Sequence, residues 1–182
     1  MFPSLPESYR CALARSRSEL VAALFFFLLG VIVGSSDPSA GASSGTLPEF
    51  TVGYFIRHNT RVLFGLWLGA PLFGIPTIVG LILNGTIFSN AVVTSHAPLT
   101  ERFALLFPHA VFELSGILVA GSVGLKPVFT FGRYVREKQS RPLEALDVRD
   151  TLRLAIISLV LIGVAGVLEA LVTPLVYQTV AG

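Results

Sequence analysis

Residues 20–34 read LVAALFFFLLGVIVG and contain no charged side chain. A transmembrane helix needs about 20 predominantly apolar residues, and this run with its flanks is close to that length. Because Arg10, Arg15 and Arg17 precede it, the segment also fits a cleavable signal peptide. We expect a retained span, because several strongly apolar segments follow it in the chain.

The composition is that of a protein surrounded by lipid. Of the 182 residues, 53% are hydrophobic and 13% are charged, whereas soluble domains carry about 25% charged residues. A water-soluble fold would have too little polar surface to cover itself. The basic residues flank apolar runs, so we expect no nucleic-acid partner. The single cysteine, Cys11, excludes an intramolecular disulfide.

Four further apolar segments predict an all-α, polytopic bundle of about five transmembrane helices. We expect a cytoplasmic segment over residues 1–17 and one transmembrane domain over residues 18–177. The predicted spans are 18–35, 50–70, 72–93, 103–125 and 152–177. Proline and glycine interrupt several of them, at Pro71, Gly74, Pro76 and Pro108. The break around Pro71 fits either a tight hairpin or a re-entrant segment held within protein.

The distribution of basic residues predicts the topology. Residues 126–149 form a predicted basic loop after the fourth span, and basic loops of membrane proteins stay in the cytoplasm. Five spans place both this loop and the basic N-terminus in the cytoplasm, whereas four spans do not. We therefore expect a multi-pass protein of the cell membrane with a cytoplasmic N-terminus and an external C-terminus.

Small residues recur at spacings of four within three predicted spans. Such spacing places them on one helix face and lets two helices approach closely in a membrane. These positions fit packing within the bundle, and an oligomer interface is the alternative. They are Gly65, Gly69, Gly116, Ala120, Gly124, Gly166 and Ala170.

Ionisable and amide side chains lie inside the predicted spans, where each charge costs about 3 kcal/mol on insertion scales. At about 1.5 Å per helical residue, the charged side chains of the second, fourth and fifth predicted spans lie at similar depths below the outer surface. The polar positions are Arg57, His58, Asn59, Arg61, Asn84, His109, Glu113 and Glu169.

We predict a cluster in which Glu113 and Glu169 neutralise Arg57 and Arg61, with His109 or His58 alongside. Ion pairs that fix helix register, arginines that reach the headgroups, a ligand or ion site, and catalysis all fit this pattern.

Signatures of known catalytic and metal sites are not found in the sequence. The spacing of His109 and Glu113 differs from the HExxH zinc motif, and neither a phosphate-binding loop nor a G-x-S-x-G elbow occurs. No nucleophile and base pair stands out. We therefore expect no enzyme activity, no bound metal and no cofactor.

Three runs resemble the stage II sporulation protein M family. They are HNTRVLFGLWLGAPLFGIPTIVGLILNG (58–85), FPHAVFELSGILVAGSVG (107–124) and GVLEALVTP (166–174). The resemblance implies a multi-span membrane protein, which in endospore formers is a component of the engulfment machinery and partners cell-wall hydrolases. Relatives also occur in organisms that form no spores. The family's polar motif corresponds here to His58, Asn59, Asn84, Gly85, Pro108, His109, Glu113 and Glu169.

Two functional hypotheses follow. The first is a membrane scaffold or remodelling component that lies in the lipid bilayer and acts through helix contacts with envelope proteins. A homo-oligomer is a further possible partner arrangement. The second is a transporter or permeation subunit that uses the Glu/His/Arg cluster. Interrupted helices favour the second hypothesis, because they often build transport sites.

Overall fold

The computed structural model describes residues 6–36, 52–93, 99–173, 175–176 and 179. Helices account for nearly all of these residues, and the described part of the chain contains no strand. The helices are α1 (Glu7–Arg15), α2 (Arg17–Ser36), α3 (Val52–Trp67), α4 (Ile75–Val93), α5 (Leu99–Val135) and α6 (Ala145–Leu171). The all-α prediction is confirmed.

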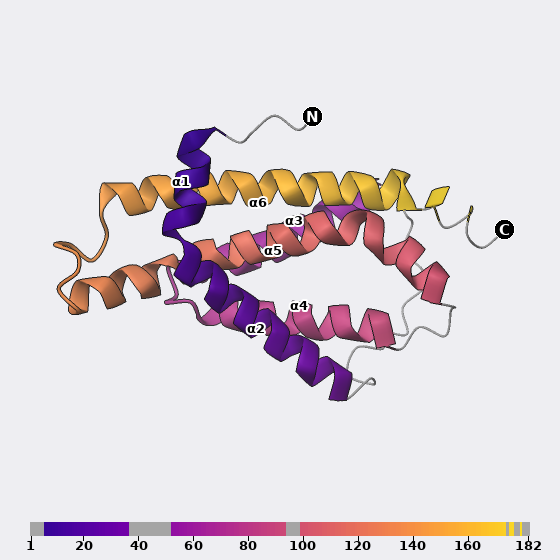
Figure 1. Ribbon diagram of the computed structural model, residues 1–182, viewed down its shortest axis with the longest axis horizontal. Helices are drawn as coiled ribbons and strands as arrows, with labels where there is room; N and C mark the ends of the chain where they lie inside the picture. The colour runs from indigo at the N-terminus through magenta and orange to yellow at the C-terminus, as the bar shows by residue number, and fades with distance from the viewer. Residues whose placement is uncertain (1–5, 37–51, 94–98, 174, 177–178, 180–182) are drawn as a thin grey trace.

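The helices α2 to α6 form the bundle, and α1 lies across it (Figure 1). The helices α2, α4 and α6 run in one direction, whereas α3 and α5 run in the other. The pairs α2 with α4 and α5 with α6 make the most extensive contacts, and α3 packs against α4, α5 and α6. The chain therefore reverses direction at each connection within the bundle, as a multi-pass protein does.

Four helices are long and apolar enough to cross a membrane: α2, α4, residues 106–135 of α5, and α6. Their outward surfaces are strongly apolar, and Phe25 and Ile87 are 61% and 62% exposed. Apolar surface on this scale aggregates in water, so lipid is its natural solvent. The fifth predicted span, α3, has 16 residues and a length of about 24 Å, less than the hydrocarbon core of about 30 Å.

Glycines bring the helices into close contact. A Cβ at Gly85 of α4 would overlap the backbone of Phe27 in α2, and one at Gly30 would overlap the backbone of Ile82. At the turn between α3 and α4, the Thr77 hydroxyl donates to the Leu66 carbonyl at 2.7 Å. Helices pack this closely in membranes where small residues line the contact.

The predicted packing positions mostly serve these internal contacts. Added Cβ atoms at Gly69 and Gly124 would meet Thr77, and one at Gly116 would meet Ile162. Ala120 is fully buried, and a Cβ at Gly166 would approach Ile56 at 3.3 Å. Two positions differ: Ala170 is half-buried, and Gly65 is exposed with no atom near its missing Cβ.

Helices extend into two polar segments of the sequence. The predicted basic loop over residues 126–149 is wrong in extent, because α5 continues to Val135 and α6 begins at Ala145. Residues 1–17, for which we predicted a cytoplasmic segment without assigning secondary structure, include α1 and the first residue of α2. The first charge after an apolar run does not end a helix when the charge is buried and paired, as it is at Lys126.

Candidate functional site

An imidazole and two carboxylates from α5 and α6 converge within the bundle. His109 Nε2 lies 3.9 Å from Glu113 Oε2 and 4.0 Å from Glu169 Oε1. The other ring nitrogen, Nδ1, lies 3.1 Å from the hydroxyl oxygen of Thr173. His109 and Glu113 share a helix face because they are four residues apart. We call His109, Glu113, Glu169 and Thr173, together with Asn59, the His109 cluster.

Asn59 supplies the contribution of α3 to this cluster. The residue is 3% exposed, and its Nδ2 has no hydrogen-bond partner among the described residues. Asn59 lies close enough to Glu169 to act on its carboxylate. A buried amide that lacks a partner is uncommon in folded proteins, where nearly all such groups are hydrogen-bonded. The Asn59 amide therefore has donor capacity that the hydrogen bonds of the described residues do not use.

Pro108 sits directly before His109 inside α5. Proline has no N–H group and its ring disrupts the preceding helical turn. Figure 1 shows the N-terminal part of α5 turning away from the line of the rest of the helix. Pro108 therefore interrupts the backbone hydrogen bonds of α5 in the turn before His109, whose imidazole approaches Glu169.

The predicted pairing of arginine with glutamate is wrong. Arg57 and Arg61 are exposed, and no ion pair joins either of them to Glu113 or Glu169. The periodicity of α3 explains the outcome: Asn59 faces the bundle, and residues two positions away on a helix lie on nearly the opposite face. Arg57 and Arg61 flank Asn59 in the sequence and so lie near the level of the cluster, but the sequence did not give the rotation of α3.

Two other predicted members also lie elsewhere. His58 is exposed and stacks on Tyr54, with ring centroids 6.2 Å apart. The Asn84 side chain donates to the Gly80 carbonyl of its own helix at 2.7 Å. The structure thus brings together Asn59 and the three ionisable groups of α5 and α6.

The His109 cluster combines two carboxylates with one imidazole and contains no lysine or arginine. Such a set can hold a proton between its members and can offer acceptor oxygens to a polar ligand. In the described part of the chain, no group of His, Cys, Asp and Glu side chains has the geometry of a metal site.

Comparison with known proteins gives the chain its family. A family model described as stage II sporulation protein M matches residues 20–174. The chain belongs to the stage II sporulation protein M family. A similar relative is an uncharacterized protein of Methanocaldococcus jannaschii, which is 30% identical over 166 residues, covering 85% of this chain and 93% of the relative. No solved structure matches the chain.

This stage II sporulation protein M family member contains a second polar cluster that the sequence reading missed. Glu19 of α2 is fully buried, and its Oε1 lies 3.6 Å from Lys126 Nζ and 3.3 Å from Arg133 Nη1. Lys126 is 2% exposed and also donates to Ser16 Oγ at 2.8 Å. Arg133 continues the chain of contacts to Asp147 Oδ1 at 3.1 Å. We call these residues the Glu19 network.

A neighbouring ion pair fixes α1 on α6. Arg15 donates from Nε and Nη2 to the two carboxylate oxygens of Asp150, at 2.6 and 2.7 Å. Arg153 Nη1 lies 3.3 Å from the same carboxylate. The hydrogen bond with Asp150 raises the pKa of Arg15 above its usual value, so the guanidinium stays charged.

A sequence signal for the Glu19 network exists in retrospect. Glu19 opens the first apolar run, and Lys126 directly follows the fourth. Opposite charges at matching ends of two spans lie at the same level of a bundle. His109 and Lys126 are separated by about 26 Å along α5, so the two clusters occupy opposite ends of the helices.

Proposed function

We propose that this family member is a membrane scaffold component that binds another envelope protein through the outer face of α3. The observation that carries the proposal is the exposure of Arg57, His58 and Arg61 on a helix that packs against three apolar helices. Arginine near the bilayer centre costs about 3 kcal/mol on insertion scales. A partner that offers carboxylates or other acceptors on a neighbouring helix removes that cost.

The shape of the same face supports a helix as the partner. Gly65 lies two turns after Arg57 and one turn after Arg61, and no atom occupies the space near its missing Cβ. Phe64 beside it is 59% exposed. A small residue flanked by polar and aromatic groups allows close approach of another transmembrane helix. Most other small faces of the bundle are already occupied by internal contacts.

Site-directed photo-cross-linking in native membranes tests the proposal. A photoreactive residue at Phe64 is expected to give an adduct with another protein. The same residue at Leu83, which is 55% exposed on α4, serves as the matched control and is expected to give none. The double variant Arg57→Gln/Arg61→Gln should abolish the Phe64 adduct. Equal adducts at both positions contradict the proposal, and an adduct of two copies of this chain would identify a homo-oligomer instead.

A second candidate function is proton-coupled permeation through the His109 cluster. The supporting observation is the convergence of His109, Glu113 and Glu169, with the unpartnered Nδ2 of Asn59 beside them. Proteoliposomes containing a pH-sensitive dye test this function. Glu169→Gln should abolish a pH-gradient-driven flux, whereas Glu144→Gln, at the other end of α6, should not. Lack of flux by the unaltered protein contradicts this candidate and leaves the scaffold proposal standing.

A further inference from the structure

An apolar groove of about 500 Å³ lies between α1 and the helices beneath it. One wall is formed by Tyr9 and Leu13 of α1 and by Pro6, which directly precedes α1. The floor includes Val119 of α5 and, on α6, Ile156 and Val160, which are 50% and 59% exposed. The volume lies in the range of small-molecule pockets, roughly 300–1,000 Å³, and apolar side chains make up nearly all of the lining.

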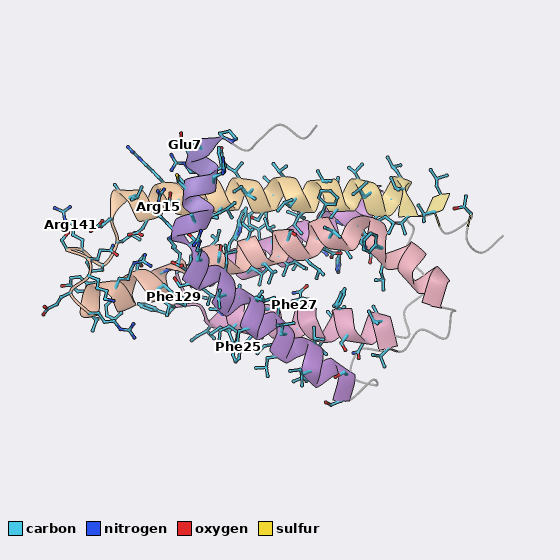
Figure 2. The ribbon with its side chains drawn as sticks, in the orientation of Figure 1. Glu7, Arg15, Phe25, Phe27, Phe129 and Arg141 are labelled. Carbon is cyan, nitrogen blue, oxygen red and sulfur yellow. The ribbon has the colours of Figure 1, made fainter. Side chains whose placement is uncertain are left out.

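The direction of α1 places this groove at a membrane boundary. Figure 1 shows α1 crossing α6 at a steep angle, whereas α6 runs along the long axis of the bundle. Figure 2 places Arg15 at the crossing, on the side of the molecule where Arg141 lies in the connection between α5 and α6. A short helix that lies across the spans at their polar end has the position of an interfacial helix.

Positive charge surrounds the same end of the bundle. The exposed basic residues there are Arg10, Arg15, Arg17, Arg136, Lys138, Arg141 and Arg149, against the exposed acids Glu7 and Glu137. Arg10 directly follows Tyr9, which lines the groove. Basic residues beside a membrane surface attract anionic lipid headgroups. An apolar groove and a basic rim together match the two parts of an anionic phospholipid.

We propose that the groove under α1 binds one anionic phospholipid, with an acyl chain along Ile156 and Val160 and the phosphate near Arg10. The Arg15–Asp150 ion pair holds α1 in place over the chain. This site is separate from the α3 face and from the His109 cluster, so its test does not depend on either proposed function.

Native mass spectrometry of the full chain, released from nanodiscs of equal parts phosphatidylglycerol and phosphatidylcholine, tests the proposal. The unaltered protein should retain one phosphatidylglycerol in preference to phosphatidylcholine. Val160→Trp fills the groove and should abolish retention, whereas Leu159→Trp, at a residue 48% exposed on another face of α6, should not. Arg10→Gln should lower the preference about fivefold, the factor expected for one basic residue near an anionic surface.

The controls separate the remaining explanations. Glu7→Gln on the same helix removes a negative charge and should not lower the preference. Inorganic phosphate or glycerol phosphate at millimolar concentration should leave the lipid bound; displacement by either would identify a soluble phosphate as the ligand and overturn the proposal. Equal retention of the two lipids would overturn the proposal as well. So would equal loss of the lipid from Val160→Trp and Leu159→Trp, if circular dichroism shows that both variants are folded.

Discussion

Replacement of Glu19 by glutamine should destabilise the bundle strongly. The substitution keeps the shape of the side chain but removes its charge, so Lys126 remains as a 2% exposed ammonium with the Ser16 hydroxyl as its near partner. At 3.6 Å and an effective dielectric constant near 20, the lost attraction amounts to about 4–5 kcal/mol. Measured losses on removal of one partner of a buried pair are about 3–5 kcal/mol. We therefore expect a loss of about 3–5 kcal/mol in the free energy of unfolding.

The measurement is reversible unfolding in mixed micelles with increasing sodium dodecyl sulfate, followed by circular dichroism. The double variant Glu19→Gln/Lys126→Met removes both charges and should regain most of the loss, to within about 1 kcal/mol of the unaltered protein. Glu137→Gln, at an exposed position, is the matched control and should change stability by less than about 0.5 kcal/mol. A Glu19→Gln protein as stable as the control, or a double variant no better than Glu19→Gln alone, would refute the reasoning.

Three further predictions concern helix contacts. Gly85→Leu places a side chain against the backbone of α2 and should lower stability in the same assay by about 1–3 kcal/mol or more; Gly163→Leu, where nothing lies within 4 Å, should be nearly neutral, and equal effects would contradict the packing. Thr77→Val removes a buried 2.7 Å hydrogen bond and should cost about 1–3 kcal/mol; an unchanged unfolding midpoint would show that the bond contributes nothing. Asp150→Asn weakens the two bonds from Arg15 and should speed tryptic cleavage of α1; an unchanged cleavage rate would argue against this anchor.

The sequence alone did not predict which side of α3 faces the His109 cluster. Hydropathy placed Arg57, Asn59 and Glu169 at similar depths, since the rise per residue of a helix is fixed. Which of them meet depends on rotation about the helix axis. That rotation is set by packing of Asn59, Leu63 and Leu66 toward the core, against side chains distant in sequence.

The sequence alone also did not predict where α5 ends, at the other end of the bundle. The apolar run of α5 stops before Lys126, so a hydropathy criterion ends the span there. In the structure Glu19 and Arg133 lie close to Lys126, and the helix continues beyond it. A hydropathy pattern predicts that a helix ends at its first charge, because the pattern does not show the oppositely charged partner on another helix.

By itself, the sequence determined that this protein is an all-α, multi-pass chain of the stage II sporulation protein M type, because long apolar runs can satisfy their backbone in lipid only as helices. It also determined that ionisable groups lie inside those helices. Only the tertiary structure decided that His109 meets Glu113 and Glu169, that Arg57 and Arg61 face outward, and that Glu19 pairs with Lys126. The physical reason is that composition sets the solvent and the length of each helix, whereas side-chain packing between helices sets their rotation.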